Sequence, residues 1–359
     1  MSHTVEPRPR AAPRISVIVP ALNERQTLAD AIQPLLEDPL GAELEVLVAV
    51  GPSTDGTREL VAEMAARDPR IHFVDNPERI TPAGLNAAIR TSRGRVILRM
   101  DGHAVPEPGY VSACLRVLEA SGAWNVGGRI VKVGRTRAAR AASAATSSPF
   151  GIGGGQRFHT LTTAADVDTV WPGCWPRWVF ERIGLFDPEM VQNQDDELNQ
   201  RLLDAGGRIR FDPSIGATYL SRGSWRGLLR QYFRYGMFKV RGFQKRPNLL
   251  RPRHLAPAAL VAVVVGGALL VPFVPLALAG LGVLVAAWLV AAAVFARRVA
   301  ADNQSTIPDV MLAFACIHAG YGGGMWVGLV RHARRFVGDP AAILPRLDPA
   351  PAGAPEHEA

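Results

Sequence analysis

The segment QNQDDELNQR contains three consecutive acidic residues, Asp195, Asp196 and Glu197. Acidic triplets are mostly solvated helix surface, and that is the plain interpretation. A carboxylate in a crevice can instead accept the proton of a hydroxyl group that attacks an electrophilic carbon. Repulsion between neighbouring carboxylates would raise the pKa of such a base toward working pH. Polar motifs upstream in the chain favour this second interpretation.

The isolated Asp101-Gly102-His103 is the second candidate for chemistry. It follows Val96–Met100, an apolar run that is typical of a strand. With one residue between them at a strand end, Asp101 and His103 can point into the same crevice. Carboxylate and imidazole both bind divalent cations, and imidazole suits Mn²⁺ better than Mg²⁺. A turn histidine without a ligand role is the alternative.

Strand and helix signals alternate in the part of the chain that must position these residues. The alternation predicts an α/β fold with right-handed crossovers and a mostly parallel sheet. In such sheets the ligand crevice lies at the carboxyl ends of the strands. We therefore expect Pro20–Glu24, Gly51–Gly56 and Asp101–His103, which all follow strands, to converge. Strands are expected at 15–20, 45–50, 71–74 and 96–100, and helices at 23–36, 57–67 and 82–92.

With these motifs in this order, the chain resembles the family 2 glycosyltransferases. Their A-type nucleotide-sugar fold has a Rossmann-like, mixed, mostly parallel sheet. Within the family, the chain is most similar to the membrane-anchored transferases of bacterial exopolysaccharide assembly, the succinoglycan type. Each motif is short, but six in the expected order are specific. They are VPALNE at 19–24, STDGT at 53–57, LNAAI at 85–89, RMDGH at 99–103, NQDDEL at 193–198 and QYFRYG at 231–236.

The resemblance implies a nucleoside diphosphate sugar as donor. It also implies a divalent cation on the diphosphate, held by Asp101, with His103 in place of the second acid of the family. This replacement favours Mn²⁺ over Mg²⁺. Val50 or Gly51 stands where the family usually has an acid before the STDGT turn, which leaves the identity of the nucleotide open. The donor-side residues carried over from the family are Pro20, Glu24, Asp55, Asn86 and Asp101. For Asn86, an ordinary position on a helix surface is the alternative.

On the acceptor side, the resemblance implies an inverting transfer. This is a direct displacement at the anomeric carbon, in which a carboxylate takes the proton of the attacking hydroxyl. Alignment with the Glu-Asp-x-Asp-Leu pattern of the family assigns the base to Asp195. Asp196 is the fallback, because the register is uncertain by one residue.

Gln231, Arg234 and Tyr235 resemble the Gln-x-x-Arg-Trp motif of membrane-bound polysaccharide synthases. In that motif the arginine can grip a diphosphate and the aromatic ring can stack on a sugar. A basic helix lying on the membrane is the alternative, and both interpretations can hold together. Trp175, at the centre of a tryptophan-rich segment, would suit an acceptor-sugar platform or belong to the core.

The segment Leu255–Ala296 has 42 residues and no charged side chain. A bilayer core needs about 20 helical residues per crossing, so the segment fits two crossings, with Pro272 and Pro275 at the turn. Basic residues flank it on both sides, as the positive-inside rule expects of an even number of crossings with a cytoplasmic N-terminal domain. A second uncharged stretch, Val310–Val330, is either a third span or a re-entrant or interfacial segment.

These observations divide the chain into five parts. Its basic surplus, a net charge of +8, lies largely beside the apolar segments, where anionic lipid attracts it, and we expect no nucleic-acid partner. The parts are a disordered lead-in at 1–13, a glycosyltransferase domain at 14–240, a basic juxtamembrane segment at 241–254, a membrane region at 255–335, and a disordered tail at 336–359. The membrane region has spans near 255–272 and 276–296, and 308–330 is the stretch for which a third span and a re-entrant or interfacial segment both stay open.

The sequence thus predicts an inverting glycosyltransferase anchored in the cell membrane by several passes, with its catalytic domain facing the cytoplasm. Its expected partners are a nucleotide-sugar donor, a lipid-linked or glycan acceptor, membrane lipids and a polysaccharide-assembly complex. A nucleotidyltransferase is one alternative, but it would carry a Gly-rich basic loop after the first strand. A non-catalytic membrane scaffold with the same fold is the other, and the presence of Asp101 and Asp195 argues against it.

Overall fold

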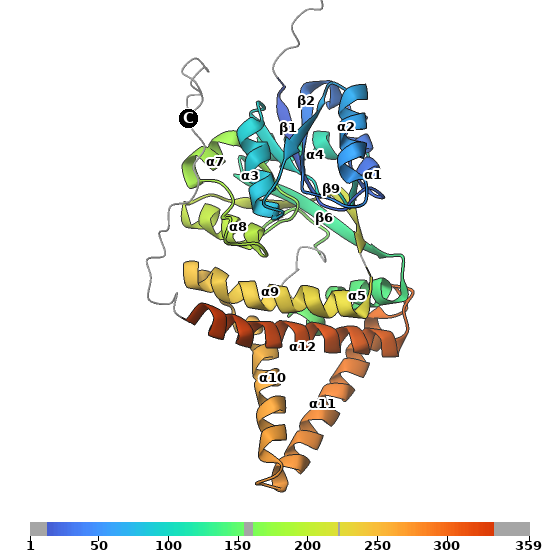
Figure 1. Ribbon diagram of the computed structural model, residues 1–359, viewed down its shortest axis with the longest axis vertical. Helices are drawn as coiled ribbons and strands as arrows, with labels where there is room; N and C mark the ends of the chain where they lie inside the picture. The colour runs from blue at the N-terminus through green and yellow to red at the C-terminus, as the bar shows by residue number, and fades with distance from the viewer. Residues whose placement is uncertain (1–12, 154–160, 222, 334–359) are drawn as a thin grey trace, which may run out of the picture.

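The computed structural model describes residues 13–153, 161–221 and 223–333. An α/β unit lies above two long helices that run side by side, α9 (Trp225–Lys245) and α12 (Ile307–His332) (Figure 1). A hairpin of two apolar helices, α10 (Pro252–Leu270) and α11 (Leu276–Val299), projects on the side away from the sheet. The ends expected to be disordered fall outside the described residues, apart from Pro13.

The α/β unit is built on a nine-stranded sheet in the order β3-β2-β1-β4-β8-β6-β9-β5, with β7 paired to β9 off this path. The longer pairings are parallel: β1 with β2 and β4, β2 with β3, and β6 with β9. The predicted mixed, mostly parallel sheet is confirmed. The strands are β1 (Ile15–Ala21), β2 (Leu44–Val50), β3 (Ile71–Asp75), β4 (Val96–Arg99), β5 (Ala104–Pro106), β6 (Asn125–Gly134), β7 (Ala165–Asp166), β8 (Cys174–Pro176) and β9 (Ile209–Ser221).

Helices cover both faces of the sheet because its central strands are apolar on both sides. In β1, Val17 and Val19 pack with α1, α2 and α4, whereas Ile18 packs with α3, α7 and α8 on the opposite face. Successive strand residues point to opposite faces, so a doubly covered strand is a continuous apolar run. The helices of the unit are α1 (Leu28–Leu36), α2 (Thr57–Arg67), α3 (Thr81–Thr91), α4 (Tyr110–Ser121), α5 (Arg137–Ser147), α6 (Pro149–Ile152), α7 (Arg177–Ile183) and α8 (Gln194–Asp204), with a short 3₁₀ turn at Gly41–Glu43.

The loops after β1, β2 and β4 converge, as predicted. Thr27 Oγ1 donates a hydrogen bond to Gly102 O (2.7 Å), and Thr54 N donates one to Asn23 Oδ1 (2.8 Å). The expected helix start at Asn23 is wrong, since α1 begins at Leu28. Asn23 has a left-handed backbone (φ 57°), which asparagine tolerates, and its side chain joins two loops instead of capping a helix.

Glycines allow α9 and α12 to pack with their backbones in close contact. A Cβ on Gly324 of α12 would lie 2.0 Å from the carbonyl oxygen of Phe233 in α9. A Cβ on Gly236 of α9 would lie 2.0 Å from the carbonyl oxygen of Tyr321 in α12. By contrast, a Cβ on Gly323 would meet nothing nearer than the Phe233 ring at 4.0 Å. The Gly-rich segment of the sequence therefore holds two helices together.

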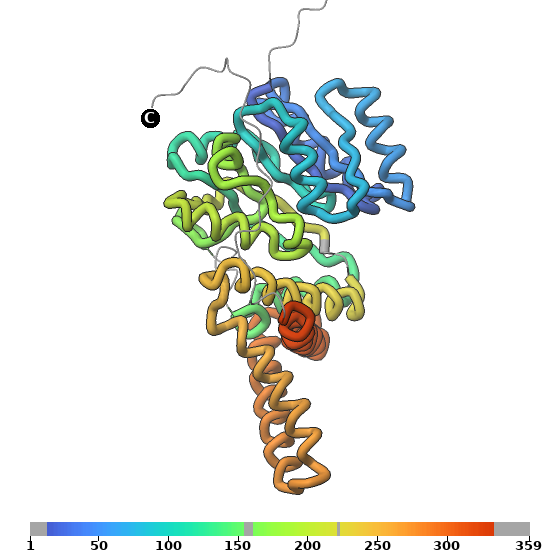
Figure 2. Tube along the Cα trace, turned by 60° about the vertical axis from the view of Figure 1, so that its left-hand side comes forward, coloured from blue at the N-terminus to red at the C-terminus, as the bar shows by residue number. Residues whose placement is uncertain are grey.

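Three helices, α10, α11 and α12, are long and apolar enough to cross a membrane. In α10 and α11 only 6% of the most apolar window is buried, and Phe273 at the hairpin tip is 81% exposed. In α12 the share is 44%, because this helix packs against α9 and the start of α10. Figures 1 and 2 show α12 running across the axis of the hairpin. The hairpin exposes its apolar surface, whereas α12 uses much of its own for packing.

The packing of α9 on α12 predicts opposite effects for two neighbouring glycines. Gly324→Ala should destabilise the protein by about 1–3 kcal/mol, because the new methyl group collides with the backbone of α9. Gly323→Ala should be neutral, or stabilising by up to about 1 kcal/mol through helix propensity, because it has room. Thermal unfolding of the two variants in detergent measures the difference. Equal stabilities would contradict the close backbone contact.

Candidate functional site

A cavity of about 1060 Å³ lies between the α/β unit and the helices beneath it. Pro20 and Asp101, at the ends of β1 and β4, line it from the sheet side, and Asp195 lines it from the start of α8. Tyr235 of α9 and the first turns of α10 line it from below. It thus opens at the carboxyl ends of parallel strands, where α/β folds bind ligands.

Arg99 joins the two acidic motifs inside this cavity. Its Nε donates to Asp101 Oδ1 (2.9 Å), and its Nη1 donates to Asp195 Oδ1. The Arg99 side chain is only 3% exposed. Burial works against its positive charge, but the two carboxylates outweigh this and raise the pKa of Arg99 above its ordinary value. One buried cation therefore fixes two carboxylates that are distant in sequence.

The two aspartates of the acidic triplet have opposite pKa shifts. Burial raises the pKa of Asp195 to about 6; Arg99 opposes this shift and the carboxylate of Asp101 adds to it. Burial also acts on Asp196, but the ammonium group of Lys239, 2.6 Å away, outweighs it and lowers the pKa of Asp196. Asp195 is therefore the better proton acceptor near neutral pH, and Asp196 is held as an ion pair.

Asp101 and His103 both line the cavity, as their spacing after the strand predicts. His103 Nδ1 lies 3.0 Å from Glu24 Oε1, and its ring meets the edge of Tyr219. Within residues 13–333, leaving out 154–160 and 222, no cluster of three or more His, Cys, Asp or Glu side chains could hold a metal. Asp101 and His103 supply only two donors, which fits a cation that takes its other ligands from a diphosphate and water.

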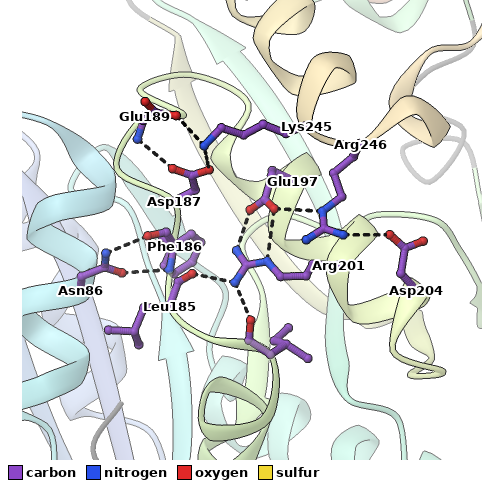
Figure 3. A network of polar contacts seen from close by, with 11 residues as sticks. Asn86, Leu185, Phe186, Asp187, Glu189, Glu197, Arg201, Asp204, Lys245 and Arg246 are labelled. Carbon is purple, nitrogen blue, oxygen red and sulfur yellow. Dashed lines mark hydrogen bonds and ion pairs between the residues drawn. The ribbon is translucent and has the colours of Figure 1, made fainter. Parts of the chain in front are cut away.

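The donor-side residues do not all meet in the cavity. Pro20 and Glu24 line it, whereas Asp55 is exposed and binds the backbone N–H groups of Arg25 and Thr57 (3.1 and 3.0 Å), which orders the loop. The expectation for Asn86 is corrected, because its side chain is buried in the core. Asn86 exchanges two hydrogen bonds, of 2.8 and 2.9 Å, with the backbone of Phe186 (Figure 3).

The side chains of α9 that face the cavity follow a helical spacing of four. Gln231, Tyr235 and Lys239 line it, and Gln231 Nε2 donates to the Tyr235 hydroxyl (2.9 Å). The expectation for Arg234 is corrected, because that side chain is exposed and is not part of the lining. Trp175 is also corrected: it is 1% exposed and packs in the core, where it cannot stack on a sugar. In the tryptophan-rich segment, it is Trp171 that reaches the cavity.

An ion-pair network fastens α8 to the end of α9 (Figure 3). Glu197, the third acid of the triplet, accepts from Arg201 (2.6 Å) and from Arg246 (3.3 Å). Lys245 pairs with Asp187 just before α8. Glu197 is therefore structural, and the network fixes the acidic helix relative to α9.

Sequence reasoning missed Arg99 and Lys239 as site residues. An arginine at the end of a buried strand needs carboxylate partners, and this requirement could have drawn attention to Arg99. Lys239 follows Gln231 and Tyr235 at intervals of four, so the helical period could have added it to the same face.

Comparisons with known proteins agree with this geometry. Residues 16–176 match the family model described as Glycosyl transferase family 2. Over 322 residues, 89% of this chain and 96% of the relative, the chain is 29% identical to the succinoglycan biosynthesis protein ExoA of Rhizobium meliloti.

Two further likenesses are more distant. A dolichyl N-acetyl-alpha-D-glucosaminyl phosphate 3-beta-D-2,3-diacetamido-2,3-dideoxy-beta-D-glucuronosyltransferase of Methanococcus voltae is 26% identical over 63% of this chain and 72% of its own length. The mannosyltransferase PcManGT from Pyrobaculum calidifontis, solved in complex with GDP-Man and Mn²⁺, has a TM-score of 0.59 at 20% identity. The match covers 91% of this chain and 90% of that one, and it shows a shared fold.

The raised pKa of Asp195 predicts how turnover depends on pH and on this residue. Below pH 6 the carboxyl group is protonated and cannot accept a proton, so kcat/KM should rise through about pH 6 and level off above it. Asp195→Asn should slow turnover by roughly 10²–10⁴-fold and remove this rise. Asp196→Asn should keep the rise, since Asp196 is already ionised by Lys239. Pre-steady-state rates measured from pH 5 to 8 test this, and near-normal turnover of Asp195→Asn would contradict it.

Proposed function

We propose that this chain, which belongs to glycosyltransferase family 2, transfers a sugar with inversion from a nucleoside diphosphate donor to a lipid-linked or polysaccharide acceptor. The observation that carries the proposal is the bridge from Asp101 through Arg99 to Asp195 inside one cavity. In the proposal Asp101 belongs to the donor side of the cavity and Asp195 to the acceptor side, and one buried guanidinium group contacts both.

In the proposed reaction, Asp195 takes the proton of the acceptor hydroxyl. The bond from that oxygen to the anomeric carbon forms while the bond from the carbon to the diphosphate oxygen breaks. The half-buried Asp195 is accessible from the cavity, and its raised pKa suits a base that must release the proton again afterwards. Arg99 holds the Asp195 carboxylate in place by a hydrogen bond to its Oδ1.

Asp101 and His103 are the residues that we propose hold a divalent cation, which when bound would neutralise charge on the leaving diphosphate. Pro20 and Glu24 line the same side of the cavity and would contact the donor. Mn²⁺ is favoured over Mg²⁺ because imidazole is a better ligand for Mn²⁺. The Mn²⁺ in the PcManGT complex supports this choice, although that protein shares only the fold.

Variants of Asp101 and His103 test the donor side. GDP and UDP should raise the melting temperature more with Mn²⁺ than with a chelator, since a ligand of the folded state stabilises it. Asp101→Ala should abolish this metal-dependent part, and His103→Asp should keep it while shifting the preference toward Mg²⁺. Arg67→Ala, on the exposed end of α2, serves as the control. Equal shifts with and without metal in the wild type would rule out the proposed cation.

The apolar hairpin supports a location in the cell membrane, with α10 and α11 as two crossings. For α12 we infer the interfacial alternative, because it lies across the hairpin and beside α9. Arg251 and Arg253 stand at the start of α10, and Arg297 and Arg298 stand at the end of α11, so both pairs flank the apolar part of the hairpin. By the positive-inside rule, this supports a catalytic domain on the cytoplasmic side.

The names of the two relatives support a role in glycan assembly. One is a succinoglycan biosynthesis protein, and the other is named for a dolichyl phosphate-linked sugar as acceptor. We infer that this chain acts in exopolysaccharide or cell-envelope glycan synthesis. A polysaccharide-assembly complex at the membrane is its proposed protein partner.

Labelling of single cysteines tests the two-crossing arrangement. In a Cys316→Ser background, the hairpin-tip variant Phe273→Cys should react with an impermeant maleimide in intact cells. Ser214→Cys, exposed on the α/β unit, should react only after lysis. The native Cys114 and Cys174 are buried and should stay silent. The reverse pattern would mean the opposite orientation, and a tip that reacts only after lysis would mean that the hairpin does not reach the outer surface.

A further inference from the structure

The cavity continues past the acidic pair to a group of basic side chains at the start of α10. Lys239 of α9 and Arg251, Arg253 and His254 all line it, and we call them the basic cluster. Lys239 forms an ion pair with Asp196 (2.6 Å), and Arg253 and His254 are near enough to Asp196 to help lower its pKa. The basic cluster therefore lies beside Asp196, immediately next to the proposed base.

Within the described residues, two members of the basic cluster form ion pairs, and Arg253 forms none. Lys239 is paired with Asp196, and Arg251 lies 3.8 Å from the exposed Asp168. Arg253 Nε is buried and has no hydrogen-bond partner within the described ranges. The Arg253 side chain also lines the cavity, so an anion bound there could form charge-assisted hydrogen bonds with its guanidinium group.

His254 adds a directed donor to the same group. Its Nδ1 accepts a hydrogen bond from the backbone N–H of Arg251 (3.1 Å), so the proton of the neutral ring is on Nε2. The cluster therefore combines a guanidinium N–H and an imidazole N–H that belong to one turn of chain. Tetrahedral oxyanions are bound by such sets of several converging donors.

Beyond the basic cluster, the lining of the cavity becomes apolar and belongs to the membrane helices. Leu260 of α10, Trp288 of α11 and Ile317 of α12 line this part. An occupant that spans both parts would need an anionic group followed by an apolar chain. The cluster also precedes α10 directly, at the level where a lipid headgroup would be expected to lie if the hairpin crosses the bilayer.

We propose that the basic cluster binds the phosphate or diphosphate group of a lipid-linked acceptor, with the lipid chain along α10 and α12 and the acceptor sugar toward Asp195. This inference rests on the proposed glycosyl transfer. Of the two acceptor classes proposed there, lipid-linked and polysaccharide, it selects the lipid-linked one. The nucleotide is not the expected occupant, because its proposed ligands, Asp101 and His103, lie at the strand ends. A bulk phospholipid is not expected either, because Arg253 and His254 line the same cavity as Asp195.

The test uses farnesyl diphosphate as a probe that carries a diphosphate on an apolar chain. Binding to the full-length protein in detergent is followed by tryptophan fluorescence, with a chelator present so that the metal-dependent donor side is silent. Farnesol, which has only the apolar chain, and inorganic diphosphate, which has only the charged group, serve as control ligands. Arg253→Gln and the exposed Arg251→Gln remove the proposed ligands one at a time. Arg230→Gln removes an equal charge from α9 at a position that does not line the cavity.

The expected result is that Arg253→Gln and Arg251→Gln each weaken farnesyl diphosphate binding by about tenfold, the effect of losing one charged hydrogen bond. Arg230→Gln should leave it unchanged, and farnesol should not distinguish the variants. Equal affinity in all variants would overturn the proposal. A second result would also overturn it: Arg230→Gln weakens farnesyl diphosphate binding as much as the cluster variants do, and all three variants bind phosphatidylglycerol vesicles more weakly than the wild type. The cluster would then be ordinary membrane-surface charge.

Nucleotide binding separates failure of this inference from failure of the proposed function. GDP or UDP with Mn²⁺ should bind Arg253→Gln as tightly as the wild type. If GDP, UDP, ADP, CDP and dTDP all fail to bind the wild type, the proposed transfer reaction fails whatever the probe does. If a nucleotide binds but farnesyl diphosphate does not, the transfer reaction stands and the lipid-phosphate site is wrong.

Discussion

The rest of the structure depends on the ion pairs that join α8 and the segment before it to α9 and the residue that follows it. Asp196 pairs with Lys239, Glu197 with Arg246, and Asp187 with Lys245, so contacts along both helices hold them in one relative position. Several of these side chains are largely buried, and removing one partner would leave the other charge unpaired in the interior. The helix that carries the acids is therefore fixed at one distance from the helix that packs on α12 and the hairpin.

Arg99 imposes a similar constraint within the cavity. A buried guanidinium group is tolerated only with good carboxylate partners, and Arg99 has two. Like charges repel, so Asp101 and Asp195 would otherwise disfavour each other's ionised forms. With Arg99 between them, the proposed donor-side acid and the proposed base can occupy one cavity. Arg99 thus links the end of β4 to α8, and the ion pairs of α8 link both to α9 and the apolar helices beneath it.

Much of the fold and part of the site could be predicted from the sequence. The apolar runs of β1, β2 and β4 are local patterns, and a run buried on both faces can form only an inner strand of a covered sheet. Polar loops at the carboxyl ends of such strands must then converge, which gave the location of Asp101. The uncharged segment from Leu255 to Ala296 likewise predicts an apolar hairpin, because length and composition alone determine that property. Motif order left Asp195 and Asp196 as the two candidates for the base, and the structure gives them different partners, Arg99 and Lys239.

Only the tertiary structure decided where individual side chains point. Asn86 and Trp175 stand in motifs that suggested a ligand, yet neighbouring elements turn both into the core. Arg99 and Asp195 are 96 positions apart, and no local pattern encodes their contact. The sequence also left open how α12 runs relative to the hairpin, because its composition suits either a membrane span or an interfacial helix. Sequence composition determines whether a segment is buried, but the packing of distant elements determines what it is buried against.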